Sequence, residues 1–361
     1  MRYPEVPCLY DIQKTWADNL KEGPRFSETI PERSFPPEDQ WIDFLGHKVA
    51  SPLGVPAGPL LNSRWIECAA NLGFDIPAYK TIRSSSHPGH PLPNMVFIDP
   101  HFDKNVAIQL DNPSSLESLG LTNSFGMPSK DPDYLIKDIA KANSCLKKGQ
   151  VMIVSVVGSN QPGISFFDDF VQVALLAKQG GAKIIEANFS CPNVDAKAGE
   201  LYTDPTTVFE LGSKLVKAIH PIPLIIKVGP FLHADLMQAV LLSAAKAGIR
   251  GFCGLNAISM TVQDKEGRSP FGPQRTKSGI CGAPIRSHAL EFITRARDII
   301  DRLKLELCLL GVGGITKPDH FRAFLKAGAD IVMSATGMMW DPYLGLKYHH
   351  LEYKNHEKAR S

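Results

Sequence analysis

The stretch Ala182–Val194, AKIIEANFSCPNV, starts as an apolar run typical of a buried strand and ends in a polar cluster. The cluster holds Asn188, Cys191 and Asn193, where a strand would give way to a loop. Barrel enzymes keep their catalytic groups at such strand ends. The stretch therefore indicates a site, although most lone cysteines are small buried apolar residues, and this alternative stays open for Cys191.

Two lysines interrupt other apolar runs at equivalent positions. Lys80, followed by Thr81, lies in AYKTI, and Lys227 lies in IIKVG. A lysine inside a buried strand is costly unless it is paired or belongs to a site. A single lysine could emerge at the rim into solvent, but two at matching places favour a site. Asn256 ends a further run in the same way.

Two glycine-containing turns follow the last two apolar runs. They are GVGGI, Gly311–Ile315, and SATGM, Ser334–Met338. Backbone amides in such turns and at helix N-termini bind phosphate, and barrels often place a phosphate after strands seven and eight. The alternative is that these glycines make tight turns and nothing more.

Eight β-prone runs alternate with eight amphipathic stretches. The strands are expected at 49–58, 75–83, 150–158, 182–190, 223–229, 248–257, 307–314 and 329–336, and the helices at 63–73, 131–149, 166–180, 206–220, 233–248, 285–303, 318–328 and 343–356. Short strands without polar alternation indicate burial on both faces and a parallel sheet. The pattern predicts an α/β fold, a (β/α)8 TIM barrel, with an open doubly wound sheet as the rival.

Three segments lie outside this alternation. Residues 84–130 and 258–284 are long connections after the second and sixth strands, and we expect them to roof the site. Residues 1–45 are polar and proline-rich, with one short helix expected around Tyr10–Leu20. We interpret residues 1–45 as an arm, a cover for the barrel bottom or a partner surface, and residues 46–361 as the barrel domain.

Composition limits the partners. The 361 residues carry 39 basic and 37 acidic side chains, a net charge of +2, which gives no electrostatic case for nucleic acid or an anionic membrane. Seven scattered cysteines without a CxxC pair argue against a disulfide framework or a metal site and suit a reducing cytosol. No apolar run is long enough to span a bilayer. A soluble, cytoplasmic protein is expected.

These residues resemble a known family, the FMN-dependent dihydroorotate dehydrogenases. The motifs that carry the resemblance are KTIRS, TNSFGMPS, EANFSCPN, IIKVG, GLNAIS, GVGGI and SATG, in that order over about residues 47 to 340. The segment Ser278–Leu290 is similar to the pyrimidine domain of dihydropyrimidine dehydrogenase. Within the family, a cysteine at position 191 marks the soluble class, whereas a serine marks the membrane-associated, quinone-using class.

The resemblance implies oxidation of (S)-dihydroorotate to orotate, in pyrimidine biosynthesis, with hydride passing to bound FMN. It assigns Cys191 as the base and Lys80 to catalysis beside the flavin, and it places Lys227 against the reduced ring. The implied FMN-binding residues are Ala57, Gly58, Lys80, Thr81, Asn188, Lys227, Asn256, Gly282, Gly313, Gly314, Ala335 and Thr336. The implied pyrimidine-binding residues are Lys80, Asn123, Gly126, Met127, Asn188, Asn193 and Asn256. Asparagine suits an imide edge because it both donates and accepts.

Four positions depart from the family pattern: Ala187, Phe189, Ala257 and Ala335. Ala335 stands near the expected phosphate, and we interpret the other three as a slightly altered substrate site, so another dihydropyrimidine stays an alternative to dihydroorotate. Two further alternatives are a Schiff-base lyase that uses Lys80 or Lys227, and a non-catalytic flavin-binding protein. The sequence leaves open the electron acceptor (fumarate, oxygen, or NAD through an iron–sulfur partner subunit) and a homodimer.

Overall fold

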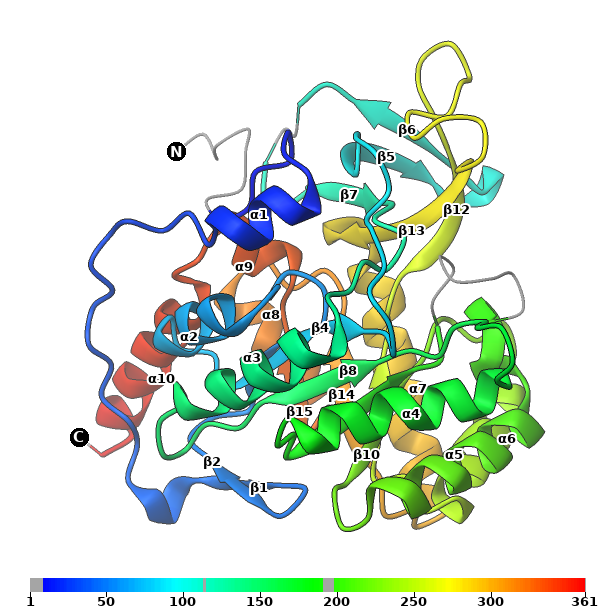
Figure 1. Cartoon of the computed structure of the whole chain (residues 1–361). Helices are drawn as coiled ribbons and strands as arrows, with labels where there is room; N and C mark the ends of the chain where they lie inside the picture. Colours follow the sequence, from blue (N-terminus) through cyan, green and yellow to red (C-terminus); the bar gives the residue numbers. More distant parts are fainter. Residues whose placement is uncertain (1–8, 113–114, 191–197, 361) are drawn as a thin grey trace.

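Eight parallel strands close into a barrel at the centre of the molecule (Figure 1). The computed structural model describes residues 9–112, 115–190 and 198–360, with side chains described up to residue 353 except at 198 and 199. The barrel strands are β3 (Leu53–Val55), β4 (Ile76–Ile82), β8 (Ile153–Val156), β9 (Ile184–Asn188), β10 (Leu224–Lys227), β11 (Gly251–Gly254), β14 (Cys308–Val312) and β15 (Ile331–Met333). Each pairs in parallel with the next, and β15 pairs with β3, so the barrel prediction is confirmed and the open sheet is excluded.

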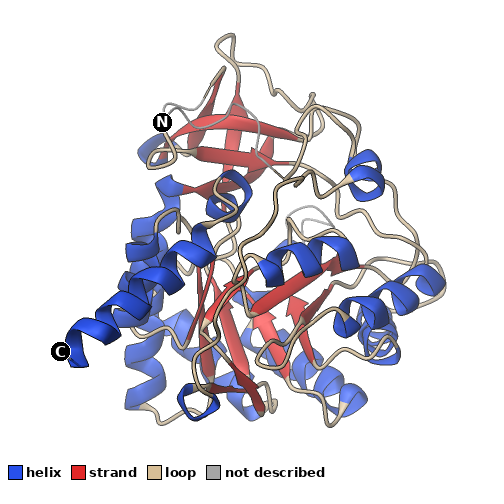
Figure 2. Cartoon of the chain, turned by 90° about the vertical axis from the view of Figure 1, so that its left-hand side faces the viewer, coloured by secondary structure: helices blue, strands red, loops and turns tan. Residues whose placement is uncertain are grey.

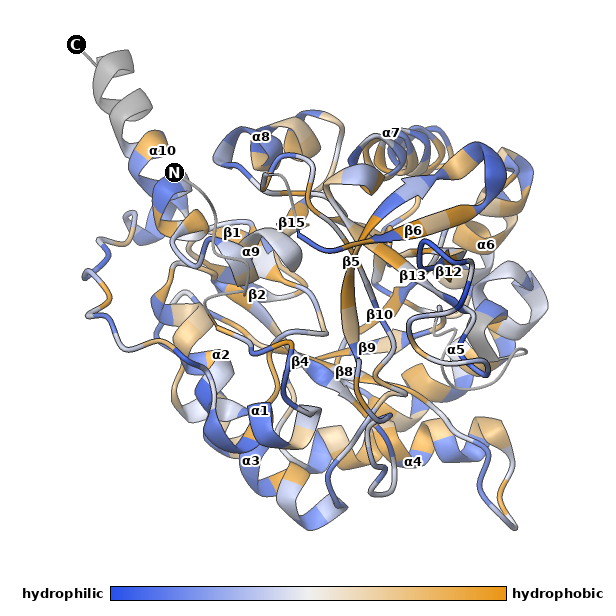
Figure 3. Ribbon diagram, turned by 90° about the horizontal axis from the view of Figure 1, so that it is seen from above, coloured by the Kyte–Doolittle hydropathy of each residue, from blue (hydrophilic) through white to orange (hydrophobic). Residues whose placement is uncertain are grey.

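All eight predicted helices are present, and viewed from above they surround the barrel (Figure 3). They are α2 (Ser63–Asn71), α3 (Pro132–Ser144), α4 (Phe166–Gln179), α5 (Pro205–Ile219), α6 (Ala234–Lys246), α7 (Arg286–Arg302), α8 (Pro318–Lys326) and α10 (Leu344–Arg360), with a short α9 (Thr336–Trp340) before α10. Side chains cap several starts: Asp131 accepts from Tyr134 and Ser165 from Asp168, which satisfies amides that a helix leaves unpaired. None of the described helices is both long and apolar enough to cross a membrane.

The two long connections contain strands that the sequence did not predict. These are β5 (Met95–His101), β6 (Val106–Leu110), β7 (Gly120–Asn123), β12 (Ile258–Gln263) and β13 (Lys277–Gly282), which close into a second, five-stranded barrel above the first (Figure 2). Their apolar side chains, among them Ile98, Met260 and Ile280, form a separate core. Local sequence patterns did not predict these strands, because they pair across more than a hundred residues of sequence, as β7 with β13.

The N-terminal region contributes to both ends of the barrel. A hairpin of β1 (Ile42–Phe44) and β2 (His47–Val49) packs Phe44 and Val49 into the inner core at the bottom. The helix α1 (Trp16–Glu22) lies at the other end, near the five-stranded barrel (Figure 1). Residues 1–45 therefore reach both ends of the barrel, with β1 at the bottom and α1 at the opposite end. Four short 3-10 helices complete the elements: Glu38–Gln40, Phe102–Lys104, Ala198–Thr203 and Ala283–Ile285.

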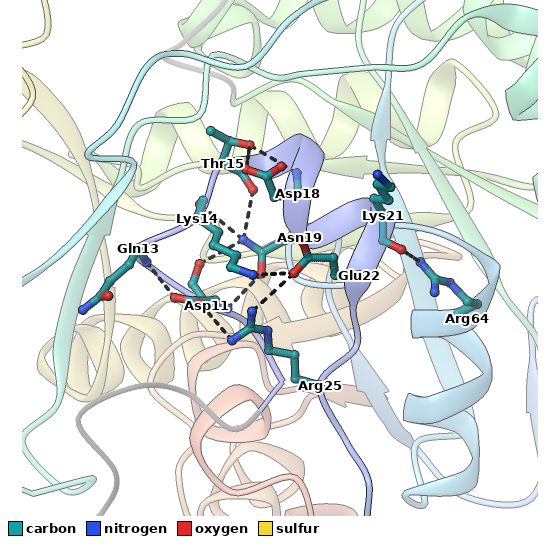
Figure 4. Close-up of polar contacts among 10 residues, drawn as sticks. All are labelled: Asp11, Gln13, Lys14, Thr15, Asp18, Asn19, Lys21, Glu22, Arg25 and Arg64. Carbon is teal, nitrogen blue, oxygen red and sulfur yellow. Dashed lines mark hydrogen bonds and ion pairs between the residues drawn. The ribbon is translucent and has the colours of Figure 1, made fainter.

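The helix α1 begins later than the predicted Tyr10–Leu20 because Thr15 caps its first turn and accepts from the Asp18 amide. A network of polar contacts holds the segment before it (Figure 4). The Asn19 side-chain amide donates to the carbonyls of Asp11, Lys14 and Thr15. From α2, Arg64 donates to the carbonyls of Leu20 and Lys21 at the end of α1.

Candidate active site

A pocket lies at the carboxyl ends of the barrel strands, beneath the five-stranded barrel and α1. Barrel strand ends supply most of its wall: Ala57, Gly58, Lys80, Thr81, Asn188, Ser190, Lys227, Asn256, Ala257, Val312, Gly313, Gly314, Met333, Ala335 and Thr336. The upper barrel adds Met95, Leu121, Asn123, Gly279, Cys281 and Gly282, and neighbouring segments add Tyr10, Trp16, Leu61, Phe125, Met127, Ile285, Ile315 and Met339. The expectation that the two long connections roof the site is confirmed in position.

Most of the residues singled out in the sequence meet in this pocket. Those described as lining it are Ala57, Gly58, Lys80, Thr81, Asn123, Met127, Asn188, Lys227, Asn256, Gly282, Gly313, Gly314, Ala335 and Thr336. Gly126 is not among the lining residues, although it directly precedes Met127. Cys191 and Asn193 lie outside the described residues, so their roles stay predictions.

Lys80 stands at the end of β4, where the barrel meets the turn that contains Met127. The Lys80 ammonium is 3.9 Å from the Met127 sulfur. The turn is in an uncommon conformation, with left-handed φ values of 73° at Gly126 and 54° at Met127. The buried Arg83 donates to both of their carbonyl oxygens, over 3.1 Å and 2.9 Å. Arg83 thus fixes the turn against Lys80, a role the sequence did not reveal.

Lys227 ends β10 and has a buried partner beneath it. Its ammonium lies 3.7 Å from the carboxylate of Glu186 on β9, and the two side chains are 2% and 0% exposed. Lys227 lines the pocket, whereas Glu186 does not. The alternative in which this lysine emerges at the rim into solvent is therefore excluded, because the side chain is buried and paired.

The asparagines at the ends of β9 and β11 are held together by hydrogen bonds. The Asn256 amide donates to the Ser190 carbonyl over 2.7 Å, and the Asn188 side-chain oxygen accepts from the Ser190 amide over 3.1 Å. These bonds fix which way each side-chain amide faces. A rigid pair of amides suits recognition of a planar ring with alternating donors and acceptors.

The turns after β14 and β15 leave backbone amides available. Within the described residues, the N–H groups of Gly313, Gly314, Ala335 and Thr336 donate no hydrogen bond, and α9 starts at Thr336 without a side-chain cap. Gly314 has a φ of 73°, and a Cβ there would lie 2.5 Å from the Cβ of Arg286. Open amides beside a helix start form an anion site, so the residues present fit a phosphate.

The four departures from the family pattern separate into two groups. Ala187 and Phe189 belong to the core between strands and helices, where Phe189 packs edge-on against Phe170 of α4 with ring centroids 5.7 Å apart. The interpretation that these two alter the substrate site is wrong, because side chains alternate along a strand and theirs face outward. Ala257 and Ala335 do line the pocket.

Sequence reasoning missed two contributions to the pocket. Cys281 on β13 lines it, and burial raises the pKa of its thiol to about 11, against a lowering effect of Lys227. Tyr10 and Trp16, from the N-terminal segment, form another part of the wall. Cys281 lies in a connection that was expected to roof the site, which was a weak indication that it could line the pocket. The sequence around Tyr10 gave no indication that this residue lies beside barrel strands far along the chain.

Comparison with known proteins agrees with this geometry. The family model described as dihydroorotate dehydrogenase matches residues 41–348. A dihydroorotate dehydrogenase of Dictyostelium discoideum is 45% identical over 370 aligned residues, which cover 98% of this chain and 100% of that protein. This chain belongs to the dihydroorotate dehydrogenase family. The family depends on a flavin, and the pocket offers the lysines, amides and open phosphate turn that such a cofactor requires.

More distant members of the dihydroorotate dehydrogenase family are similar over most of their length. The catalytic subunit of an NAD+ enzyme, dihydroorotate dehydrogenase B of Methanopyrus kandleri, is 27% identical, with 82% of this chain and 84% of that protein covered. A quinone-type dihydroorotate dehydrogenase of Acinetobacter baylyi is 25% identical, with 83% of each chain covered. The relatives thus include enzymes with different electron acceptors.

Proposed function

We propose that this chain oxidises dihydroorotate to orotate, in pyrimidine biosynthesis, with FMN as its cofactor. The observation that carries the proposal is the charge of the pocket. Its described lining includes Lys80 and Lys227 but no aspartate or glutamate, and Glu186, which offsets part of the charge of Lys227, lies behind the lining. The Arg83 guanidinium lies just behind the Gly126–Met127 turn. A cationic lining favours an anionic ligand, and dihydroorotate carries a carboxylate that dihydrouracil and dihydrothymine lack.

The proposed cofactor site spans the pocket from its floor to the last two strands. The open amides of Gly313, Gly314, Ala335 and Thr336 would hold the FMN phosphate. The other proposed contacts are Ala57, Gly58, Lys80, Thr81, Asn188, Lys227, Asn256 and Gly282, all among the lining residues. When bound, the flavin supplies a hydride acceptor at N5.

Cys191 is the proposed base that removes the proton from C5 of the substrate. A thiol has a pKa near ~8.5, close enough to neutral pH for general-base catalysis. Cys281, a described cysteine in the pocket wall, is a poor rival because burial raises its pKa to about 11. Lys80, Asn123, Gly126, Met127, Asn188, Asn193 and Asn256 are the proposed substrate contacts, with Lys80 also placed beside the reacting carbon atoms.

The remaining roles are also proposals. Residues 1–45 would be an extension whose α1 closes one side of the pocket, and residues 46–361 the FMN-binding domain. We place the enzyme in the cytoplasm, as a homodimer or with an electron-transfer subunit. Relatives named as catalytic subunits of NAD+ enzymes support the second arrangement. Sedimentation of the protein purified from its native source distinguishes the two.

Anaerobic reduction of the bound flavin tests the proposal. Dihydroorotate should bleach the flavin absorbance at least tenfold faster than dihydrouracil or dihydrothymine, because a charge-assisted hydrogen bond is worth about 1.5–3 kcal/mol. The matched comparison is the Lys80→Met variant. In this variant the ratio of the reduction rate with dihydroorotate to the rate with dihydrouracil or dihydrothymine should be smaller than in the wild type. Faster reduction by an uncharged dihydropyrimidine would shift the assignment to that substrate, and a protein that retains no flavin on reconstitution with FMN would refute it altogether.

The Schiff-base alternative finds little support. A lysine nucleophile must be a neutral amine, whereas Lys227 faces the carboxylate of Glu186 in an ion pair. Lys80 lies in the same cationic pocket, and its ammonium lies against the Met127 sulfur. Borohydride trapping with carbonyl substrates should leave both lysines unmodified.

A further inference from the structure

Glu186 is a buried carboxylate that the proposed mechanism does not use. Its side chain is 0% exposed, and within the described residues neither carboxylate oxygen has a hydrogen-bond partner other than the Cys253 thiol. Removing a carboxylate from water costs several kcal/mol of free energy unless favourable interactions with other groups offset that cost. An ordinary core position in β9 would carry an apolar residue, as Ile184 does two positions earlier on the same face. The carboxylate therefore points to a role at the adjacent pocket.

The partner of Glu186 is the pocket lysine. Its carboxylate lies 3.7 Å from the Lys227 ammonium, and Lys227 is its one ion-pair partner among the described residues. The thiol of Cys253 on β11 is also buried, and burial, followed by the charge of Glu186, raises the pKa of that thiol well above its usual value. Cys253 thus stays neutral, and its thiol adds a hydrogen bond to Glu186 but no charge.

The arrangement is layered. Lys227 lines the pocket, and Glu186 does not, so the ammonium lies between any ligand above and the carboxylate below. Both groups are out of water, where charges interact far more strongly than at the surface. A carboxylate on one side of the ammonium lowers the positive potential that the ammonium presents on the other side.

We infer that Glu186 is a positioning residue that, through Lys227, sets how much positive charge the pocket floor presents to a bound flavin. The inference deepens the proposed function and rests on it. Reduction adds negative charge to the flavin ring, so unbalanced positive charge below it favours the reduced form. The Glu186–Lys227 pair therefore holds the flavin potential below the value that Lys227 alone would give.

The first test needs no flavin. We compare thermal unfolding of the flavin-free protein for wild type, Glu186→Gln, Lys227→Met and the double variant. Lys227→Met leaves an unpaired buried carboxylate and should lower the melting temperature most, whereas the double variant should recover at least half of that loss. Additive losses in the double variant would show that the two residues do not act as a pair. If the Lys227→Met variant does not fold, the inference requires that the double variant folds.

The second test measures the midpoint potential of the bound flavin by dye equilibration. Glu186→Gln should raise the midpoint potential by at least about 30 mV for the two-electron couple. At a fixed potential, the ratio of reduced to oxidised flavin then rises at least tenfold. Lys227→Met should lower the midpoint potential, and Ile184→Val, which alters apolar packing on the same face of β9 without changing charge, should leave it unchanged. A change in packing alone does not predict that the midpoint potential shifts in opposite directions in Glu186→Gln and Lys227→Met.

The outcomes separate the two proposals. An unchanged or lowered potential in Glu186→Gln would overturn the inference while flavin binding by the wild type still supported the proposed function. A wild-type protein that bound no flavin would refute the proposed function, and the unfolding comparison would then decide whether Glu186 and Lys227 form a pair.

Discussion

The Arg83 side chain donates from Nε to the carbonyl oxygen of Met127 over 2.9 Å, and this bond ties the end of β4 to the turn that contains Met127. A second bond from the same guanidinium reaches the carbonyl of Gly126. Both acceptor residues have left-handed φ values. Such backbone conformations persist where surrounding contacts hold them, so the turn depends on Arg83.

Arg83→Ala should weaken substrate binding more than flavin binding. Loss of the guanidinium leaves two carbonyls without their donor and frees the turn that presents Met127. Hydrogen bonds from charged donors are worth about 1.5–3 kcal/mol, so the Kd of orotate should rise roughly tenfold or more. Titration of orotate against the flavin spectrum measures it. Arg275→Ala, which removes a more exposed donor to Ser124, is the control and should have a smaller effect.

The pH profile of flavin reduction should identify the base. In the wild type the rate should rise with pH as the thiol loses its proton, up to about pH 8.5. Cys191→Ser should slow reduction at pH 7 by about 100-fold or more, since a hydroxyl loses its proton far less readily. Cys281→Ser should change the rate little, because the pKa of this thiol is about 11. A larger effect of Cys281→Ser than of Cys191→Ser would reverse the assignment.

Asn19→Ala should open the side of the pocket that α1 covers. The substitution removes four hydrogen bonds to the backbone of Asp11, Lys14 and Thr15, which precede α1, each worth about 1 kcal/mol. Trp16 belongs to the same helix and lines the pocket, so the flavin should become more accessible to solvent. Iodide quenching of flavin fluorescence should increase. Gln13→Ala, a change at an exposed neighbour, should leave quenching as in the wild type.

Stability should fall in mild acid because of His349. Burial, followed by the charge of Arg33, lowers the pKa of His349 to about 4, and its Nε2 lies 2.7 Å from the Gly73 carbonyl. The unfolded chain has the ordinary pKa near ~6.5, so it binds more protons than the folded protein between these values. The contribution of His349 to the unfolding free energy should drop by about 1–2 kcal/mol from pH 7 to pH 5.

Urea denaturation at the two pH values measures this drop. His349→Gln should remove most of the contribution, since glutamine does not titrate and can still donate to the Gly73 carbonyl. The exposed neighbour His350 provides the matched control, His350→Gln, which should keep the wild-type difference. An equal drop in both variants would contradict the assignment to His349.

The main barrel could be predicted from the sequence because each of its strands and helices is marked by residues within or next to that element. Apolar runs such as 182–190 mark strands buried on both faces, and capping residues such as Asp131 and Ser165 mark helix starts. The ends of those strands carried Lys80, Asn188, Lys227 and Asn256, and a parallel barrel must bring its carboxyl ends together. These polar pocket residues could therefore be expected to lie together before any contact was known.

The tertiary structure decided what depends on distant partners. The upper barrel exists because β7 pairs with β13 and β6 with β12, ladders that join segments far apart in the chain. The alternation of side chains along β9 turned Phe189 outward and Glu186 inward, beneath Lys227. Sequence by itself determined the family, the main barrel and the set of polar groups at its mouth. Only the folded chain set the charge beneath Lys227, the turn held by Arg83 and the placement of Trp16, because each arises from contacts between residues that are remote in sequence.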